Sequence, residues 1–191
     1  MVTAIKGPAA YAPLAAGFVI FGPVRVIFTT IQNVVKPEMS QAIGSGNTRA
    51  AYRQTILASS VSLAAVSGLI LLTYLAWPLL EQWLYAEKYS DAPMRTIVFL
   101  WAGITLVAAA QNGPFAALQS LKEFKHLALA TVYGSVLSLL LVTLTLALYP
   151  IHYSIIGIMA AELFVMVWVI RLASESFGSR IGAVSLAAKN V

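Results

Sequence analysis

Long runs without charge constrain this chain more than any other feature of its sequence. Between Thr55 and Leu80, 26 consecutive residues include no Asp, Glu, Lys or Arg. A helix needs about 20 apolar residues to cross a hydrocarbon core about 30 Å thick. Of the 191 residues, 60% are hydrophobic and 10% are charged, whereas about 25% of the residues in soluble domains are charged. A water-soluble core could not bury this much apolar surface, so the sequence predicts an integral membrane protein.

The apolar runs predict an all-α protein with about five transmembrane helices in a single domain. Each run is continuous, whereas the strands of a transmembrane barrel are shorter and alternate in polarity. The expected spans are 9–35, 55–80, 96–118, 127–148 and 155–172. Asn47 or Thr48 is expected to cap the second span. Gly134, Ser135 and Ser138 give the fourth span a small-residue face suited to close helix packing.

Two prolines are expected to interrupt helices within the membrane. Pro23 follows Gly22 in the middle of the first span, and Pro114 ends the sequence Gln111-Asn112-Gly113-Pro114 in the third. A proline inside a helix removes one backbone hydrogen bond and kinks or breaks the helix. Membrane helices tolerate this where neighbouring helices satisfy the freed carbonyl.

Basic residues gather in alternate loops of the expected topology. The loop 36–53 has Lys36, Arg49 and Arg53 against one acidic residue, and the loop 119–126 has two lysines against one. Lys and Arg are enriched in cytoplasmic loops, which predicts an external N-terminus and a cytoplasmic C-terminus. The net charge of +5 has the same explanation, so no nucleic-acid partner is expected. An odd number of spans with an external start is what the C-terminal part of a larger transporter would show.

Two charged residues inside the spans are the first candidates for function. Arg25 interrupts the first span, and an arginine near the middle of a membrane is costly unless it faces a wet cavity or a partner. Alternatively, Arg25 pairs with a neighbouring helix or extends to the membrane surface. Glu162 lies in the fifth span, where it would bind a coupling cation or a proton, or pair with Arg25. The other interpretation of Glu162 is a position near the outer interface.

Two amides are the next candidates. Gln111 and Asn112 lie beside the expected break at Pro114, and broken helices form binding sites in several transporter folds. The alternative is a simple kink in which the amides bond to a neighbouring helix. No metal or cofactor is expected, because the chain has no cysteine and its two histidines, His126 and His152, fall in different loops. No enzyme motif is present, so the sequence does not predict an enzyme.

The stretch AAYAPLAAGFVIFGPVRVI followed by VVKPEMSQAIGSGN resembles the polysaccharide-exporter branch of the lipid-linked oligosaccharide flippases. These flippases belong to the superfamily of the multidrug and toxin exporters. The resemblance extends through WLYAEKYSDA and the turn ALQSLKE. It implies the C-terminal half of a two-bundle transporter of the bacterial inner membrane. That transporter would flip undecaprenyl-pyrophosphate-linked oligosaccharide, such as O-antigen repeat units, by alternating access. Arg25 would then bind the pyrophosphate, and the partners would be membrane lipids and a missing N-terminal half.

Three other functions stay open from the sequence. A multidrug-type, cation-coupled exporter would favour acidic residues in its cavity, and Arg25 argues against it. A membrane glycosyltransferase or polymer ligase would need a sizeable polar loop, and every expected loop here is short. A non-transporting membrane subunit would account for the odd number of spans and for the small-residue face of the fourth span.

Overall fold

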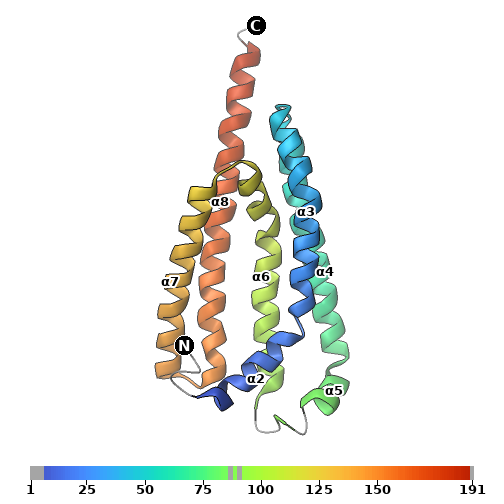
Figure 1. The fold of residues 1–191 in the computed structure, drawn as a ribbon, viewed down its shortest axis with the longest axis vertical. Helices are drawn as coiled ribbons and strands as arrows, with labels where there is room; N and C mark the ends of the chain where they lie inside the picture. The colour runs from blue at the N-terminus through green and yellow to red at the C-terminus, as the bar shows by residue number, and fades with distance from the viewer. Residues whose placement is uncertain (1–6, 86–87, 90–91, 190–191) are drawn as a thin grey trace.

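The computed structural model describes residues 7–85, 88–89 and 92–189, which are almost entirely helical and include no strand (Figure 1). Four helices in this part of the chain are long and apolar enough to cross a membrane, and α2 with α3 would form a fifth, bent span. The all-α fold with four or five helices of membrane-spanning length is therefore confirmed. The long helices are α2 (Pro8–Val19), α3 (Gly22–Gly44), α4 (Thr48–Leu75), α6 (Met94–Ser120), α7 (Phe124–Leu148) and α8 (Ser154–Lys189).

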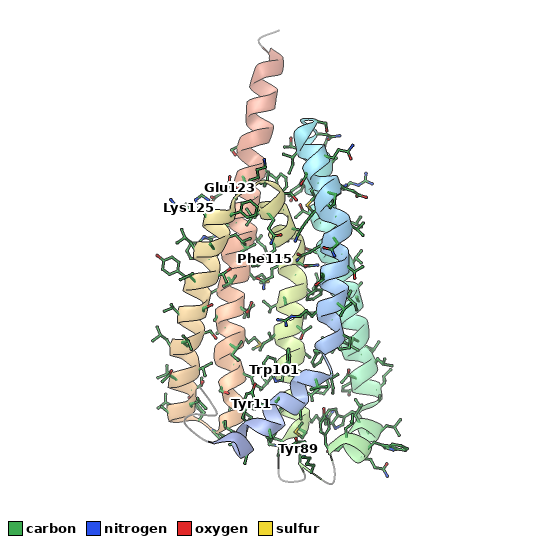
Figure 2. All side chains as sticks on the ribbon, viewed as in Figure 1. Tyr11, Tyr89, Trp101, Phe115, Glu123 and Lys125 are labelled. Carbon is green, nitrogen blue, oxygen red and sulfur yellow. The ribbon has the colours of Figure 1, made fainter. Side chains whose placement is uncertain are left out.

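Helix α6 is the centre of the bundle. It packs against α2, α3, α4 and α8, whereas α7 packs mainly against α8. The α3–α4 hairpin and the end of α8 extend past the α6–α7 turn at the upper end of the molecule, and α2 slants across the lower end (Figure 1). Figure 2 shows Glu123 and Lys125 at the upper turn and Tyr89 at the opposite end. The residues of the predicted basic loops thus lie together at one end.

The first connection is shorter than the predicted loop of residues 36–53. Helix α3 continues through Pro37 to Gly44, and α4 already begins at Thr48. The carbonyl that Pro37 leaves without a donor belongs to Asn33, which is exposed and lies near the end of the span, where water can satisfy it. Asn47 caps α4 as predicted, because its side chain accepts a hydrogen bond of 3.1 Å from the backbone N–H of Ala50.

The ends of the later spans also differ from prediction. Helix α4 stops at Leu75, and two short elements, α5 (Trp77–Leu80) and the π-helix η1 (Glu81–Tyr85), follow it. Helix α8 begins after the 3₁₀ turn η2 (Ile151–Tyr153) and continues well beyond residue 172, to Lys189. Loss of apolar character marks where a helix leaves the membrane, but it does not end the helix.

Helix α2 is fixed to the rest of the bundle by two aromatic side chains that donate to its backbone. Trp101 of α6 donates its indole N–H to the carbonyl of Leu14 at 3.0 Å, and its ring packs against Phe18. Tyr85 donates its hydroxyl to the carbonyl of Ala16 at 3.4 Å. Burial, helped by the neighbouring Tyr89, raises the pKa of the Tyr85 hydroxyl, so it remains a donor at neutral pH.

The small-residue face of the fourth span packs as its composition predicts at one position. Gly134 of α7 is buried, and a Cβ atom there would collide with the side chain of Val165 on α8. The absence of a side chain therefore lets α7 and α8 approach closely. Ser135 and Ser138 of the same face do not enter this contact but line a hollow beside it.

Candidate functional site

One row of α6 residues separates two hollows on the same side of the bundle. Ile104, Ala108, Gln111 and Phe115 are spaced by three or four positions and therefore share a face of the helix. Ile104 and Ala108 border a hollow shared with α2 and α3, and Phe115 borders a second hollow shared with α7 and α8. We call this row and its two hollows the open face.

Arg25 lies in the first hollow, which has a volume of about 260 Å³. The side chain is exposed, and its guanidinium has no hydrogen-bond or salt-bridge partner among the residues that the structure describes. The walls of the hollow are mostly aromatic and apolar. They include Phe18, Phe21, Val24, Phe28, Trp101 and Ile104. The hollow thus offers a permanent positive charge beside aromatic rings, without a protein anion to neutralise it.

Glu162 lies in the second hollow, which has a volume of about 400 Å³ between α6, α7 and α8. Its side chain is half-buried, and its Oε2 accepts a hydrogen bond of 3.0 Å from Nε2 of Gln111. The hollow also contains the hydroxyl residues Thr131, Ser135 and Ser138. Sequence reasoning did not identify these three as neighbours of Glu162, because they come from a different helix.

Arg25 and Glu162 both lie near the middle of the span but do not pair with each other. The α6 residues around Arg25 are 101–108, whereas those around Glu162 are 111–115. At 1.5 Å per residue, the centres of the two levels are about 13 Å apart along α6, and each lies within about 10 Å of the helix midpoint. No salt bridge joins the two side chains, which occupy separate hollows. The expected alternative of an Arg25–Glu162 ion pair is therefore not what the structure contains.

Asn112 points away from the open face and connects three helices. It is buried, and its Oδ1 accepts a 2.6 Å hydrogen bond from Nε2 of Gln32 on α3. Its Nδ2 donates to Oγ of Ser62 on α4 at 2.8 Å. This geometry matches the alternative in which the amide bonds to neighbouring helices. Gln32 of α3 thus belongs to the same network.

The chain does not break at Pro114, where a broken helix was expected. Helix α6 runs through this residue without interruption. Pro114 leaves the carbonyl of Ala110 without its usual donor, but Oγ of Ser59 on α4 donates to that carbonyl at 2.8 Å. Pro23, in contrast, lies just after a real interruption, since α2 ends at Val19 and α3 starts at Gly22 with a bend of 47°. The interruption therefore lies where a helix break was expected, directly before Pro23.

The fold defines a class, a helical protein whose apolar helices fit a multi-pass membrane protein. Within it, Arg25 and Glu162 line the two hollows of the open face. Comparisons of the chain with models of protein families, with curated proteins and with solved structures found no match.

Proposed function

We propose that this chain is the component of a membrane transporter that binds the head group of a lipid-linked oligosaccharide and moves it across the bacterial cell membrane. The observation that carries the proposal is Arg25, a cation with no partner among the described residues, in an aromatic hollow near mid-membrane. Such a residue costs about 2.5–3.5 kcal/mol on insertion scales. That cost is understandable if Arg25 faces an anionic ligand or a water-filled path rather than lipid tails.

A pyrophosphate group fits the chemistry of this hollow. Guanidinium has a fixed charge and a planar fork of donors, and it binds phosphate oxygens in a bidentate manner. The aromatic and apolar walls around Arg25 suit the hydrocarbon next to the phosphate in a lipid carrier. The open face would be completed by a second helical bundle, and rocking of the two bundles would expose the site to each side in turn.

The orientation in the membrane belongs to the same proposal. Five basic residues lie at the end of the bundle that holds the α3–α4 hairpin and the α6–α7 turn. They are Lys36, Arg49, Arg53, Lys122 and Lys125. Because cytoplasmic loops carry an excess of Lys and Arg, this end would face the cytoplasm. Transport would then move the head group from the basic end toward the end where α2 lies.

A cation-coupled multidrug exporter is the second candidate, because Glu162 also lies on the open face. A carboxylate inside the membrane could bind a cationic drug directly. The two candidates differ in which residue contacts the transported molecule. In the first it is Arg25, and in the second it is Glu162.

Replacing Arg25 in the cell that makes the protein tests the proposal. In R25A, we expect export of lipid-linked oligosaccharide to fall by about tenfold or more, since a hydrogen bond to a charged group contributes about 1.5–3 kcal/mol. R25K should retain part of the activity because it keeps the charge but loses the fork. Export is measured as oligosaccharide on the carrier at the outer leaflet, and the amount of protein in the membrane is measured by immunoblot.

R49A is the matched control, because Arg49 is exposed at the tip of the α3–α4 hairpin, far from the hollow. Normal oligosaccharide export in R25A, at normal protein level, would remove Arg25 from transport. Loss of resistance to cationic drugs in E162Q, with unchanged oligosaccharide export in R25A, would favour the multidrug exporter instead.

A further inference from the structure

Gln111 has a buried oxygen atom that no hydrogen bond satisfies. Its side chain is 7% exposed, and the nitrogen of its amide donates to Oε2 of Glu162 at 3.0 Å. The other amide atom, Oε1, is buried and has no donor in the described structure. A buried polar atom without a partner is costly and calls for an explanation.

An ionised Glu162 cannot supply the missing donor. A carboxylate only accepts hydrogen bonds, whereas a protonated carboxyl also carries one O–H donor. A carboxylic acid and a carboxamide can form two antiparallel hydrogen bonds, with N–H donating to C=O in one and O–H donating to C=O in the other. We propose that Glu162 and Gln111 form such a pair and constitute a proton-binding site inside the membrane.

The described residues around Glu162 offer its carboxyl few other hydrogen-bond donors. From α6, it faces Gln111 and Phe115, and from α7 it faces Thr131, Ser135 and Ser138. The hydroxyl of Thr131 donates to the carbonyl of its own helix at Leu127, and that of Ser135 donates to the carbonyl of Thr131. These two donors are therefore already in use.

No positive charge compensates Glu162 in this hollow. None of the other residues that line it carries an acidic or basic side chain. Arg25 belongs to the other hollow, and Arg171 on the same helix is nine positions further along. A carboxylate here would be a half-buried anion with one amide donor, whereas the carboxylic acid carries no charge and can donate to Gln111.

The proton-binding site adds an energy source to the proposed function, and this part of the inference rests on that function. If the open face is a transport path, a proton bound in it at mid-membrane would allow a proton gradient to drive the movement. The existence of the acid–amide pair can nevertheless be tested without any transport assay. Failure of the pair and failure of the transport proposal can therefore be told apart.

Infrared difference spectroscopy of the full chain in lipid vesicles is the direct test. At neutral pH, the spectrum of the unmodified protein minus that of E162Q should contain the carbonyl absorption of one protonated carboxyl. In Q111L, this absorption should move to higher wavenumber, because the carbonyl loses its amide donor. E175Q is the matched control, since Glu175 lies exposed on α8 and its removal should change only carboxylate absorptions. Gel filtration of each variant checks that it is folded.

Three results would overturn the proposal. Carboxylate absorption from Glu162 at neutral pH would show that it holds no proton. A carboxylate absorption that changes when choline chloride is replaced by sodium chloride would indicate a metal-cation site instead. A protonated carboxyl whose absorption is the same in Q111L would show that the proton is not shared with the amide.

Discussion

Pro23 follows a bend of 47° between α2 and α3, whereas Pro114 lies inside an uninterrupted α6. Both residues are preceded by glycine and both lie within apolar sequence. Each removes the hydrogen bond to the carbonyl four positions earlier. The two regions therefore begin with the same chemical defect and differ in what surrounds it.

The regions around Pro23 and Pro114 differ in whether another group donates a hydrogen bond to the freed carbonyl. At Pro114 that carbonyl belongs to Ala110, and the hydroxyl of Ser59 on α4 donates to it. At Pro23 it belongs to Val19, whose side chain is 70% exposed, and no side chain in the described part of the chain donates to its carbonyl. There the chain instead turns through tighter bonds from Phe21 to Phe18 and from Val24 to Phe21. Of these two prolines, the one whose freed carbonyl gains a side-chain donor lies inside a continuous helix, and the one without such a donor lies at a bend.

The largest loss of stability is expected from a side chain at Gly113, where α4 and α6 approach closely enough for Ser59 to donate to the carbonyl of Ala110. Gly113 lies against the backbone oxygen of Thr55, and a Cβ there would also come within 2.6 Å of Oγ of Ser59. G113V should force α4 and α6 apart and lower the stability by about 3 kcal/mol or more, or prevent assembly. Thermal unfolding followed by tryptophan fluorescence in detergent measures the loss. G68V is the control, because a Cβ at Gly68 would meet no atom within 4 Å, so an equal loss in both would contradict the packing argument.

Removing the hydroxyl of Ser59 should cause the next largest loss of stability. In S59A, the carbonyl of Ala110 has no partner, and we expect α6 to bend at Pro114 and stability to fall by about 1–2 kcal/mol. The chain has no native cysteine, so spin labels can be placed uniquely near the two ends of α6 to measure the bend as a shorter distance. In a P114A background, the same serine substitution should cost less, because the backbone N–H that replaces the proline nitrogen bonds to this carbonyl directly. An equal cost in both backgrounds would show that Ser59 does not act through the carbonyl.

Restoring a backbone N–H donor at Pro23 should have the smallest effect on stability. P23A gives Val19 a new N–H partner, so α2 should turn toward the axis of α3 and the distance between spin labels on the two helices should increase. Stability should change by less than about 1 kcal/mol, since the gained hydrogen bond offsets strain in the contacts of α2 with Trp101. P37A is the comparison, because α3 is already continuous there. An unchanged distance in P23A would mean that packing, rather than the missing donor, causes the bend.

The sequence predicts most of the fold because its main signals are local. The length of an apolar run determines whether a helix can span a membrane, and the Asn47 cap acts only three residues away. The same local signals placed Arg25 and Glu162 within spans. They could not show that these residues share an open face without pairing, since that depends on how α3, α6 and α8 pack.

The rest of the site depends on partners far apart in the chain. Asn112 bonds to Gln32 and Ser62, which lie 80 and 50 positions away. Whether Pro114 breaks its helix depends on Ser59, 51 positions before the carbonyl that it satisfies. A pattern that only counts neighbouring residues cannot contain this information. The amides therefore suggested a binding site, although one of them holds helices together.

The network around Asn112 also bears on how the protein is made. Helix α6 is the least apolar of the four long spans and carries Gln111, Asn112 and Pro114, so by itself it partitions into lipid less favourably than the other three. The partners of Asn112 and of the Ala110 carbonyl, which are Gln32, Ser59 and Ser62, precede α6 in the chain. The partner of Gln111, Glu162, follows it. During synthesis, α3 and α4 therefore emerge first and can receive α6 as it leaves the insertion machinery. The order in which the helices are synthesised, as well as hydrophobicity, would then favour insertion of α6 into the membrane.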